Sequence, residues 1–177
     1  MYDDQGLCNE FSSTTDKTNY SKHKLQSELY NSNGLNFRLG KLFGNLNKHQ
    51  YKLTEKILKE KTLFLDDALF NPVSVDCVCQ VLKNSNFISN NIGIFNLAND
   101  GVVSHIEYGK FIVEKLCLNT NIYHRTLINK PFPNHGNFAM SIDKIKKHMN
   151  IRRWEEELIN YLESIGCEVY HDSIIHT

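Results

Sequence analysis

The sequence has no net charge, because 20 Lys and Arg residues balance 20 Asp and Glu residues. A protein that binds nucleic acid non-specifically needs a basic surface that releases counterions from phosphate, so we expect no nucleic-acid partner. No apolar run approaches the ~18 to 20 residues of a membrane span. The first residues, Met1 to Asp4, are acidic where a secretory signal would be basic and then apolar. We therefore expect a cytoplasmic protein that has no membrane partner.

Cysteines are few and odd in number, five in 177 residues, which indicates reduced thiols rather than a disulfide framework. Cys77 and Cys79 are two residues apart in a predicted helix, so their thiols point to different faces and do not readily share a metal ion. The histidines show no ligand spacing such as His-x-x-x-His. We expect no metal site.

Apolar periodicity and turn residues predict an α/β fold in a single structural unit over residues 1–177. The expected helices span about 16–30, 48–59, 72–82, 104–116, 142 onward and 152–164, and the expected strands span 35–39, 62–65, 92–97 and 121–127. Pro72 is expected to open the third helix. Ser104 and Glu107 match the capping-box pattern that marks a helix start, and His105 beside them is expected to be exposed.

Tyr20 and Lys24 are four residues apart in the first predicted helix, which places both side chains on one helix face within reach of a common ligand. An ammonium one turn away stabilises a phenolate, so a tyrosine hydroxyl can exchange its proton nearer neutral pH. Such a pair can protonate a carbonyl oxygen while hydride reaches the carbon. Eight tyrosines and 16 lysines also produce this spacing by chance, so its meaning depends on the surrounding sequence.

Several segments occur in the order found in one enzyme family. They are residues 19–28 (NYSKHKLQSE), 37–44 (FRLGKLFG), 95–105 (FNLANDGVVSH), 130–131 (KP) and 140–145 (MSIDKI). The first resembles the Tyr-x-x-x-Lys helix of the extended short-chain dehydrogenases, and the others resemble the strands, turns and late helix that follow it. The similarity is greatest to the dTDP-4-dehydrorhamnose reductase branch, including the reductase half of UDP-rhamnose synthases, and covers about residues 2–162.

The nine glycines form no Gly-x-Gly-x-x-Gly turn, the motif with which this family brings backbone N–H groups to the pyrophosphate of NAD(P). Residues 2–6 resemble the segment just after the family's catalytic Ser or Thr, so that residue would precede Met1. The resemblance therefore implies the C-terminal portion of a Rossmann-type enzyme, with most of the N-terminal dinucleotide-binding half absent. NAD(P) is implied as cofactor, but we expect this chain alone not to bind it.

The resemblance also divides the chain. Residues 1–45 would be the last part of the catalytic Rossmann half, 46–165 the substrate-side portion, and 166–177 a tail. Lys41 stands where reductases of this branch commonly have an aromatic residue near the sugar, which leaves the substrate open.

Roles for five residues follow from the resemblance. Tyr20 would deliver the proton, and Lys24 would assist it and hold the nicotinamide ribose. Arg38, Lys130 and His135 would bind the sugar nucleotide. From the residues alone, Arg38 can instead pair with a carboxylate at a strand end, and the loop that holds Lys130 and His135 can be ordinary exposed polar surface.

These expectations combine into one functional hypothesis: the substrate-side portion of an NAD(P)-dependent reductase of nucleotide-linked 4-keto-6-deoxysugars, inactive alone. An upstream Rossmann-half polypeptide or a homo-oligomer would be its protein partner. Two alternatives stay open. The same fold serves as a non-catalytic binding module, such as the regulatory subunit of methionine adenosyltransferase, and the chain can also be a truncated gene product.

Overall fold

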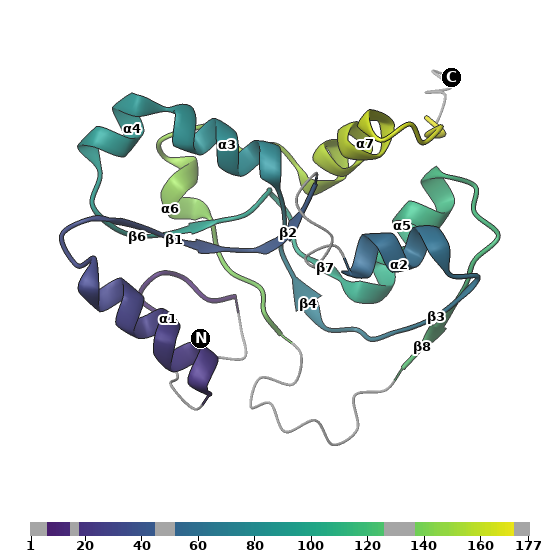
Figure 1. Cartoon of the computed structure of the whole chain (residues 1–177), viewed down its shortest axis with the longest axis horizontal. Coiled ribbons are helices and arrows are strands. Elements are labelled where there is room, and N and C mark those ends of the chain that lie inside the picture. Colours follow the sequence, from purple (N-terminus) through teal and green to yellow (C-terminus); the bar gives the residue numbers. More distant parts are fainter. Residues whose placement is uncertain (1–6, 15–17, 45–51, 126–136, 172–177) are drawn as a thin grey trace.

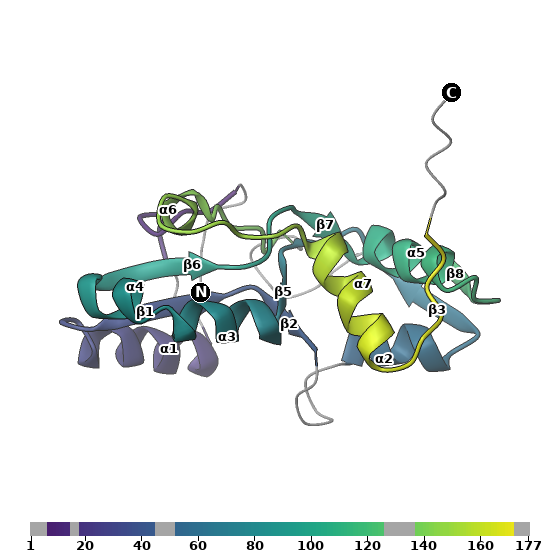
Figure 2. The same ribbon diagram turned by 90° about the horizontal axis from the view of Figure 1, so that it is seen from above.

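The computed structural model describes residues 7–14, 18–44, 52–125 and 137–171 as an α/β structure (Figures 1 and 2). The helices are α1 (Asn19–Tyr30), α2 (Lys52–Lys59), α3 (Val75–Lys83), α4 (Ser85–Asn90), α5 (His105–Lys115), α6 (Asp143–Lys146) and α7 (Trp154–Ser164). The strands are β1 (Leu35–Leu39), β2 (Lys41–Phe43), β3 (Thr62–Leu65), β4 (Leu69–Phe70), β5 (Pro72–Ser74), β6 (Gly93–Leu97), β7 (Val103–Ser104) and β8 (Asn121–His124). The α/β class predicted from the sequence is confirmed.

Helix starts follow their capping residues. The predicted box at Ser104 is confirmed, since Ser104 Oγ accepts a hydrogen bond from Glu107 N (3.1 Å) and Glu107 Oε2 accepts one from Ser104 N (2.9 Å). The helix expected to open at Pro72 begins instead at Val75. Pro72 belongs to β5, and Ser74 Oγ accepts the hydrogen bond of Cys77 N (2.9 Å), so serine rather than proline caps this helix.

The described strands form four pairs. Three are parallel, β1 with β6, β2 with β5 and β3 with β8, and the short strands β4 and β7 are antiparallel. Helices α3 and α4 lie on one side of the β1–β6 pair and α1 lies on the other (Figure 1).

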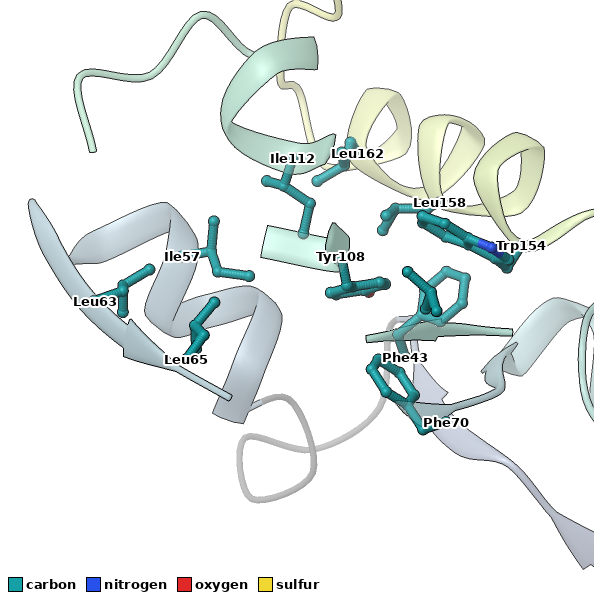
Figure 3. Packing of buried hydrophobic residues seen from close by; sticks show 11 residues of the cluster. Phe43, Ile57, Leu63, Leu65, Phe70, Tyr108, Ile112, Trp154, Leu158 and Leu162 are labelled. Carbon is teal, nitrogen blue, oxygen red and sulfur yellow. The ribbon is translucent and has the colours of Figure 1, made fainter. Parts of the chain in front are cut away.

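Two clusters of buried apolar residues hold the elements together. One joins α2, α5 and α7 to the strands beside them, and Figure 3 shows Ile112, Leu158 and Leu162 meeting in it. The other lies between α3, α6 and β6 and contains Val81, Phe95 and Ile145. Helix α1 contributes to neither cluster. Within the described residues, no helix has both the length and the apolar character needed to cross a bilayer.

The two neighbouring cysteines of α3 lie on different faces, as their spacing predicts. Cys77 is buried and Cys79 is exposed. Burial raises the pKa of Cys77 to about 12, and the nearby Glu157 adds to the rise. At neutral pH the Cys77 thiol is therefore protonated, which suits a packing role rather than a nucleophile.

Candidate functional site

Helix α1 carries the Tyr–Lys pair but has almost no apolar face of its own. Only Ser21 is buried, and it serves the N-terminal cap, where its N–H donates to Thr18 Oγ1 (3.1 Å). A helix without an apolar stripe gains little from packing, so another interaction must fix it to the sheet. Arg38 of β1 supplies that interaction: its Nε and Nη2 donate to the two carboxylate oxygens of Glu28 at 2.8 and 2.7 Å.

A tight turn sets the direction of α1 against β1. Gly34 N donates to Asn31 O (3.0 Å), and the Asn31 side chain donates to Leu35 O (3.3 Å) and Asn36 Oδ1 (3.1 Å). A Cβ at position 34 would lie 2.1 Å from Asn31 Oδ1, so a larger residue there would displace the Asn31 side chain that makes these bonds. Because the chain reverses here, the amino-terminal end of α1 lies toward the carboxyl end of β1 (Figure 1).

Tyr20 and Lys24 share one exposed face of α1. The Lys24 Nζ atom lies 5.6 Å from the centre of the Tyr20 ring, and the Tyr20 side chain is 70% exposed. The two predicted catalytic residues are thus brought together, near the amino-terminal end of the helix. In open α/β sheets the carboxyl edge of the strands is where ligands bind, and this pair lies toward that edge of β1 and β6.

Of the three residues predicted to bind substrate, the structure describes only Arg38. Arg38 is buried and engaged with Glu28, which is the carboxylate pairing that the sequence left open as an alternative. Lys130 and His135 lie outside the described residues. The substrate roles of Arg38, Lys130 and His135 therefore stay predictions.

A hollow of about 680 Å³ opens on the α1 side of the β1–β6 pair. Its apolar lining includes Phe11, Leu25 and Leu29, of which Phe11 and Leu29 are 90% and 74% exposed. Its charged groups are engaged with the wall: Glu28 with Arg38, Glu10 with Asn96 N (2.9 Å), and Lys144 with Ile94 O (2.6 Å). An apolar wall whose charges are already engaged suits protein contact better than a polar ligand.

The two outer edges of the β1–β6 pair differ. Side chains close the outer edge of β6, where Glu10 binds Asn96 N and Lys144 binds Ile94 O. Gly40 N, just after β1, donates to Leu97 O of β6, so the backbone N–H and C=O groups of the even-numbered residues point toward β6. The backbone groups of Phe37 and Leu39 therefore point away from β6. Those outward groups have no partner among the described residues. Only the β1 edge is thus ready to accept another strand.

Sequence reasoning missed a cluster of charged residues that come together from four elements. Lys41 Nζ lies 2.9 Å from His105 Nε2, His105 Nδ1 lies 2.6 Å from Asp66 Oδ1, and Arg125 Nη2 donates to Asp66 Oδ2 at 3.1 Å. Lys41 begins β2 and His105 begins α5, whereas Asp66 follows β3 and Arg125 follows β8. The expectation that His105 is simply exposed was wrong, since its side chain is 19% exposed and bound on both ring nitrogens.

Electrostatics explain how Asp66 is held in this cluster. Burial alone would raise the pKa of Asp66, but hydrogen bonds from His105 and Arg125, together with the charge of His105, lower it to about 2. Asp66 is thus a carboxylate at neutral pH and accepts both bonds.

Comparison with known proteins identifies the fold. No family model and no curated protein matches the sequence. Among solved structures, a dTDP-4-dehydrorhamnose reductase from Clostridium acetobutylicum matches with a TM-score of 0.77 at 20% identity, over 93% of this chain and 62% of that chain. A dTDP-4-dehydrorhamnose reductase from Bacillus anthracis, solved in complex with NADP, matches with a TM-score of 0.68 at 15% identity, over 92% and 60%.

The fold is that of the Rossmann-type extended short-chain dehydrogenases. A UDP-N-acetylglucosamine 4-epimerase from Methanobrevibacter ruminantium also matches, with a TM-score of 0.69 at 15% identity over 88% of this chain and 56% of that one. The chain spans about three fifths of the length of the reductases that it matches. The resemblance in fold that the sequence motifs indicated is confirmed.

Loss of the Arg38–Glu28 pair should destabilise the protein. Arg38→Ala leaves the half-buried Glu28 carboxylate without its guanidinium, and we expect the free energy of unfolding to fall by about 3 kcal/mol. A double variant, Arg38→Met with Glu28→Leu, should lose much less because neither charge is left behind. Urea unfolding measures both. Equal losses in the two variants would show that the ion pair does not hold the helix.

Asp66 should make stability depend on pH in the acid range. Its folded pKa of about 2 lies below the ordinary aspartate value of 3.8, so its stabilising effect is complete above about pH 4 and disappears as the pH falls toward 2. The stability advantage of the wild type over Asp66→Asn should therefore shrink across this range in urea titrations. Asp67→Asn, which removes the same charge from an exposed neighbouring position, is the control for the change in net charge. A difference in the free energy of unfolding between wild type and Asp66→Asn that does not change with pH would contradict the lowered pKa of Asp66.

Proposed function

We propose that this chain is the substrate-side portion of an NAD(P)-dependent reductase of nucleotide-linked 4-keto-6-deoxysugars. One observation carries the proposal: Tyr20 and Lys24 lie on one exposed face of α1, toward the carboxyl edge of a parallel strand pair. The fold shared with dTDP-4-dehydrorhamnose reductases supports the same substrate class.

In the proposed reaction the Tyr20 hydroxyl gives its proton to the carbonyl oxygen of the sugar. The Lys24 ammonium stabilises the phenolate left on Tyr20, which lowers the barrier to proton transfer. Arg38 keeps α1 seated on β1 through Glu28, and Lys130 and His135 remain the predicted contacts to the sugar nucleotide. NAD(P), when bound, supplies the hydride.

The residues present fit only one end of that cofactor. Tyr20 and Lys24 are the groups that would hold its nicotinamide ribose, but the nine glycines of the sequence provide no turn for the pyrophosphate. The charged groups of the large hollow are engaged with its wall and cannot replace such a turn. We therefore propose that a separate dinucleotide-binding half completes the enzyme.

The outward edge of β1 is the proposed docking place for that half. A partner strand there would pair with the backbone groups of Phe37 and Leu39 and extend the parallel sheet. In this proposal, residues 1–45 belong to the catalytic half and residues 46–165, which include α2, belong to the substrate side.

A matched pair of tyrosine variants tests the catalytic role. The chain is mixed with the N-terminal dinucleotide-binding half of a dTDP-4-dehydrorhamnose reductase, and NADPH oxidation is followed with dTDP-4-dehydrorhamnose. Tyr20→Phe should lower kcat by about 100-fold or more, the usual contribution of a positioned acid. Tyr30→Phe, at a 92% exposed position of the same helix, should leave kcat unchanged.

Two results would contradict the proposal. NADPH-dependent reduction by the purified chain alone would show that no partner half is needed. Full association of the two halves without any reductase activity, in wild type and Tyr20→Phe alike, would favour the non-catalytic binding module instead.

A proline at the β1 edge should block docking without disturbing β6. Leu39→Pro removes an outward N–H, and proline is tolerated where that group faces away from its paired strand. We expect the dissociation constant for the partner half to rise about tenfold or more, because one backbone carbonyl of the partner strand would have no N–H donor on β1. Leu39→Ala keeps the N–H and is the matched control. Calorimetric titration measures both, and equal binding by the two variants would place the partner elsewhere.

A further inference from the structure

The Lys41 amine is held in a way that differs from other lysines of the protein. Lys59 and Lys146 donate to carboxylates, and Lys144 donates to a carbonyl oxygen. Lys41 faces the imidazole nitrogen of His105 at 2.9 Å. An imidazole nitrogen, unlike a carbonyl oxygen, takes a proton at neutral pH.

The bonds on His105 fix which nitrogen is available. The Asp66 carboxylate only accepts hydrogen bonds, so His105 Nδ1 carries a proton and donates to it at 2.6 Å. In neutral His105 the lone pair is then on Nε2, pointing at Lys41 Nζ. A nucleophile, a base within hydrogen-bond reach and a third group that orients the base form the arrangement that activates nucleophiles in enzymes.

The surroundings of Lys41 make its charged form less favourable than that of a lysine in water. The residue is exposed at the surface, yet its Nζ lies 5.0 Å from the centre of the Phe70 ring, and the same ring packs on His105 at 4.8 Å. Partial burial lowers the pKa of Lys41, although the charge of Asp66 opposes the shift. The amine is therefore both reachable from solvent and poorly solvated on its inner side.

A small hollow beside Lys41 contains a possible donor for an oxygen atom. Its volume is about 20 Å³, and its wall includes Phe43, Phe70 and Tyr108, which lie together in Figure 3. Thr54 Oγ1 and Tyr108 OH, also in this wall, share one hydrogen bond of 3.0 Å. Two hydroxyls have two protons and their mutual bond uses one, so the second can be donated to an oxygen in the hollow.

We propose that Lys41 is a nucleophilic amine that forms an imine with small aldehydes or ketones. His105 Nε2 takes a proton from the Lys41 ammonium, and the freed lone pair of Nζ bonds to the carbonyl carbon while the π electrons move to oxygen. The oxygen receives the proton held by His105 and, after a second proton leaves nitrogen for it, departs as water. The ammonium and the carbonyl compound thus become a protonated imine and one water molecule, without any oxidant or reductant.

Reductive trapping on the complete chain tests this reactivity. The protein is incubated with glycolaldehyde and sodium cyanoborohydride, which fixes imines as stable amines, and labelling of each lysine is followed by peptide mass spectrometry. Lys41 should be labelled about 100-fold faster than Lys24, the advantage expected from a positioned base. Lys24 is exposed, lies over a tyrosine ring, and serves as the internal control in the same sample.

Variants of His105 separate base catalysis from simple exposure. His105→Phe keeps a ring on Phe70, and His105→Gln keeps a polar group near Lys41, but neither takes a proton at neutral pH. Labelling of Lys41 should fall to the Lys24 rate in both, while circular dichroism verifies that the variants fold. The proposal is overturned if wild-type Lys41 reacts no faster than Lys24, a comparison that needs no variant, or if a folded His105 variant keeps the fast rate.

This reactivity is independent of the proposed reductase. The trapping uses the chain alone, without a partner half, nicotinamide cofactor or sugar nucleotide. Failure of the reductase assay therefore leaves the Lys41 result standing, and the reverse also holds.

Discussion

The ion pair between Arg38 and Glu28 is the interaction on which the arrangement of the amino-terminal part depends. Helix α1 buries only Ser21 and contributes to neither apolar cluster, so the hydrophobic effect does little to place it. Two charge-assisted hydrogen bonds between the little-exposed side chains of Arg38 and Glu28 fix the helix instead. Such bonds are directional, and they are strong where water is excluded. The position of Tyr20 and Lys24 relative to the sheet follows from this pair and from the turn at Gly34.

The amino-terminal part of the molecule also has an open strand edge and an exposed apolar surface, two features usually found in a protein interior. One edge of the β1–β6 pair is closed by Glu10 and Lys144, whereas the opposite edge presents outward backbone groups. Apolar residues also line a wide hollow on the α1 side of the strand pair. The cost of exposing them is offset only if another surface covers them, which agrees with a chain spanning about three fifths of its structural neighbours.

Local signals predicted most elements. The strand at 35–39 was placed correctly by alternation, and α5 by its Ser104 box, because both signals act within a few residues. The predicted start of α3 at Pro72 was wrong, since β5 pairs with β2 and that contact is made across 30 residues of sequence. Very short strands, such as the two-residue β4 and β7, were missed because an alternation of apolar and polar residues cannot be recognised over so few positions.

The sequence alone determined the Tyr20–Lys24 spacing, the missing glycine turn and the resemblance in fold, because each depends on residue identity and near neighbours. Only the tertiary structure decided that Arg38 faces Glu28 and that Lys41, Asp66, His105 and Arg125 meet. These residues are far apart in the chain. Asp66 and Arg125 meet because they directly follow β3 and β8, which pair in parallel, and Lys41 and His105 reach them from the first residues of β2 and α5.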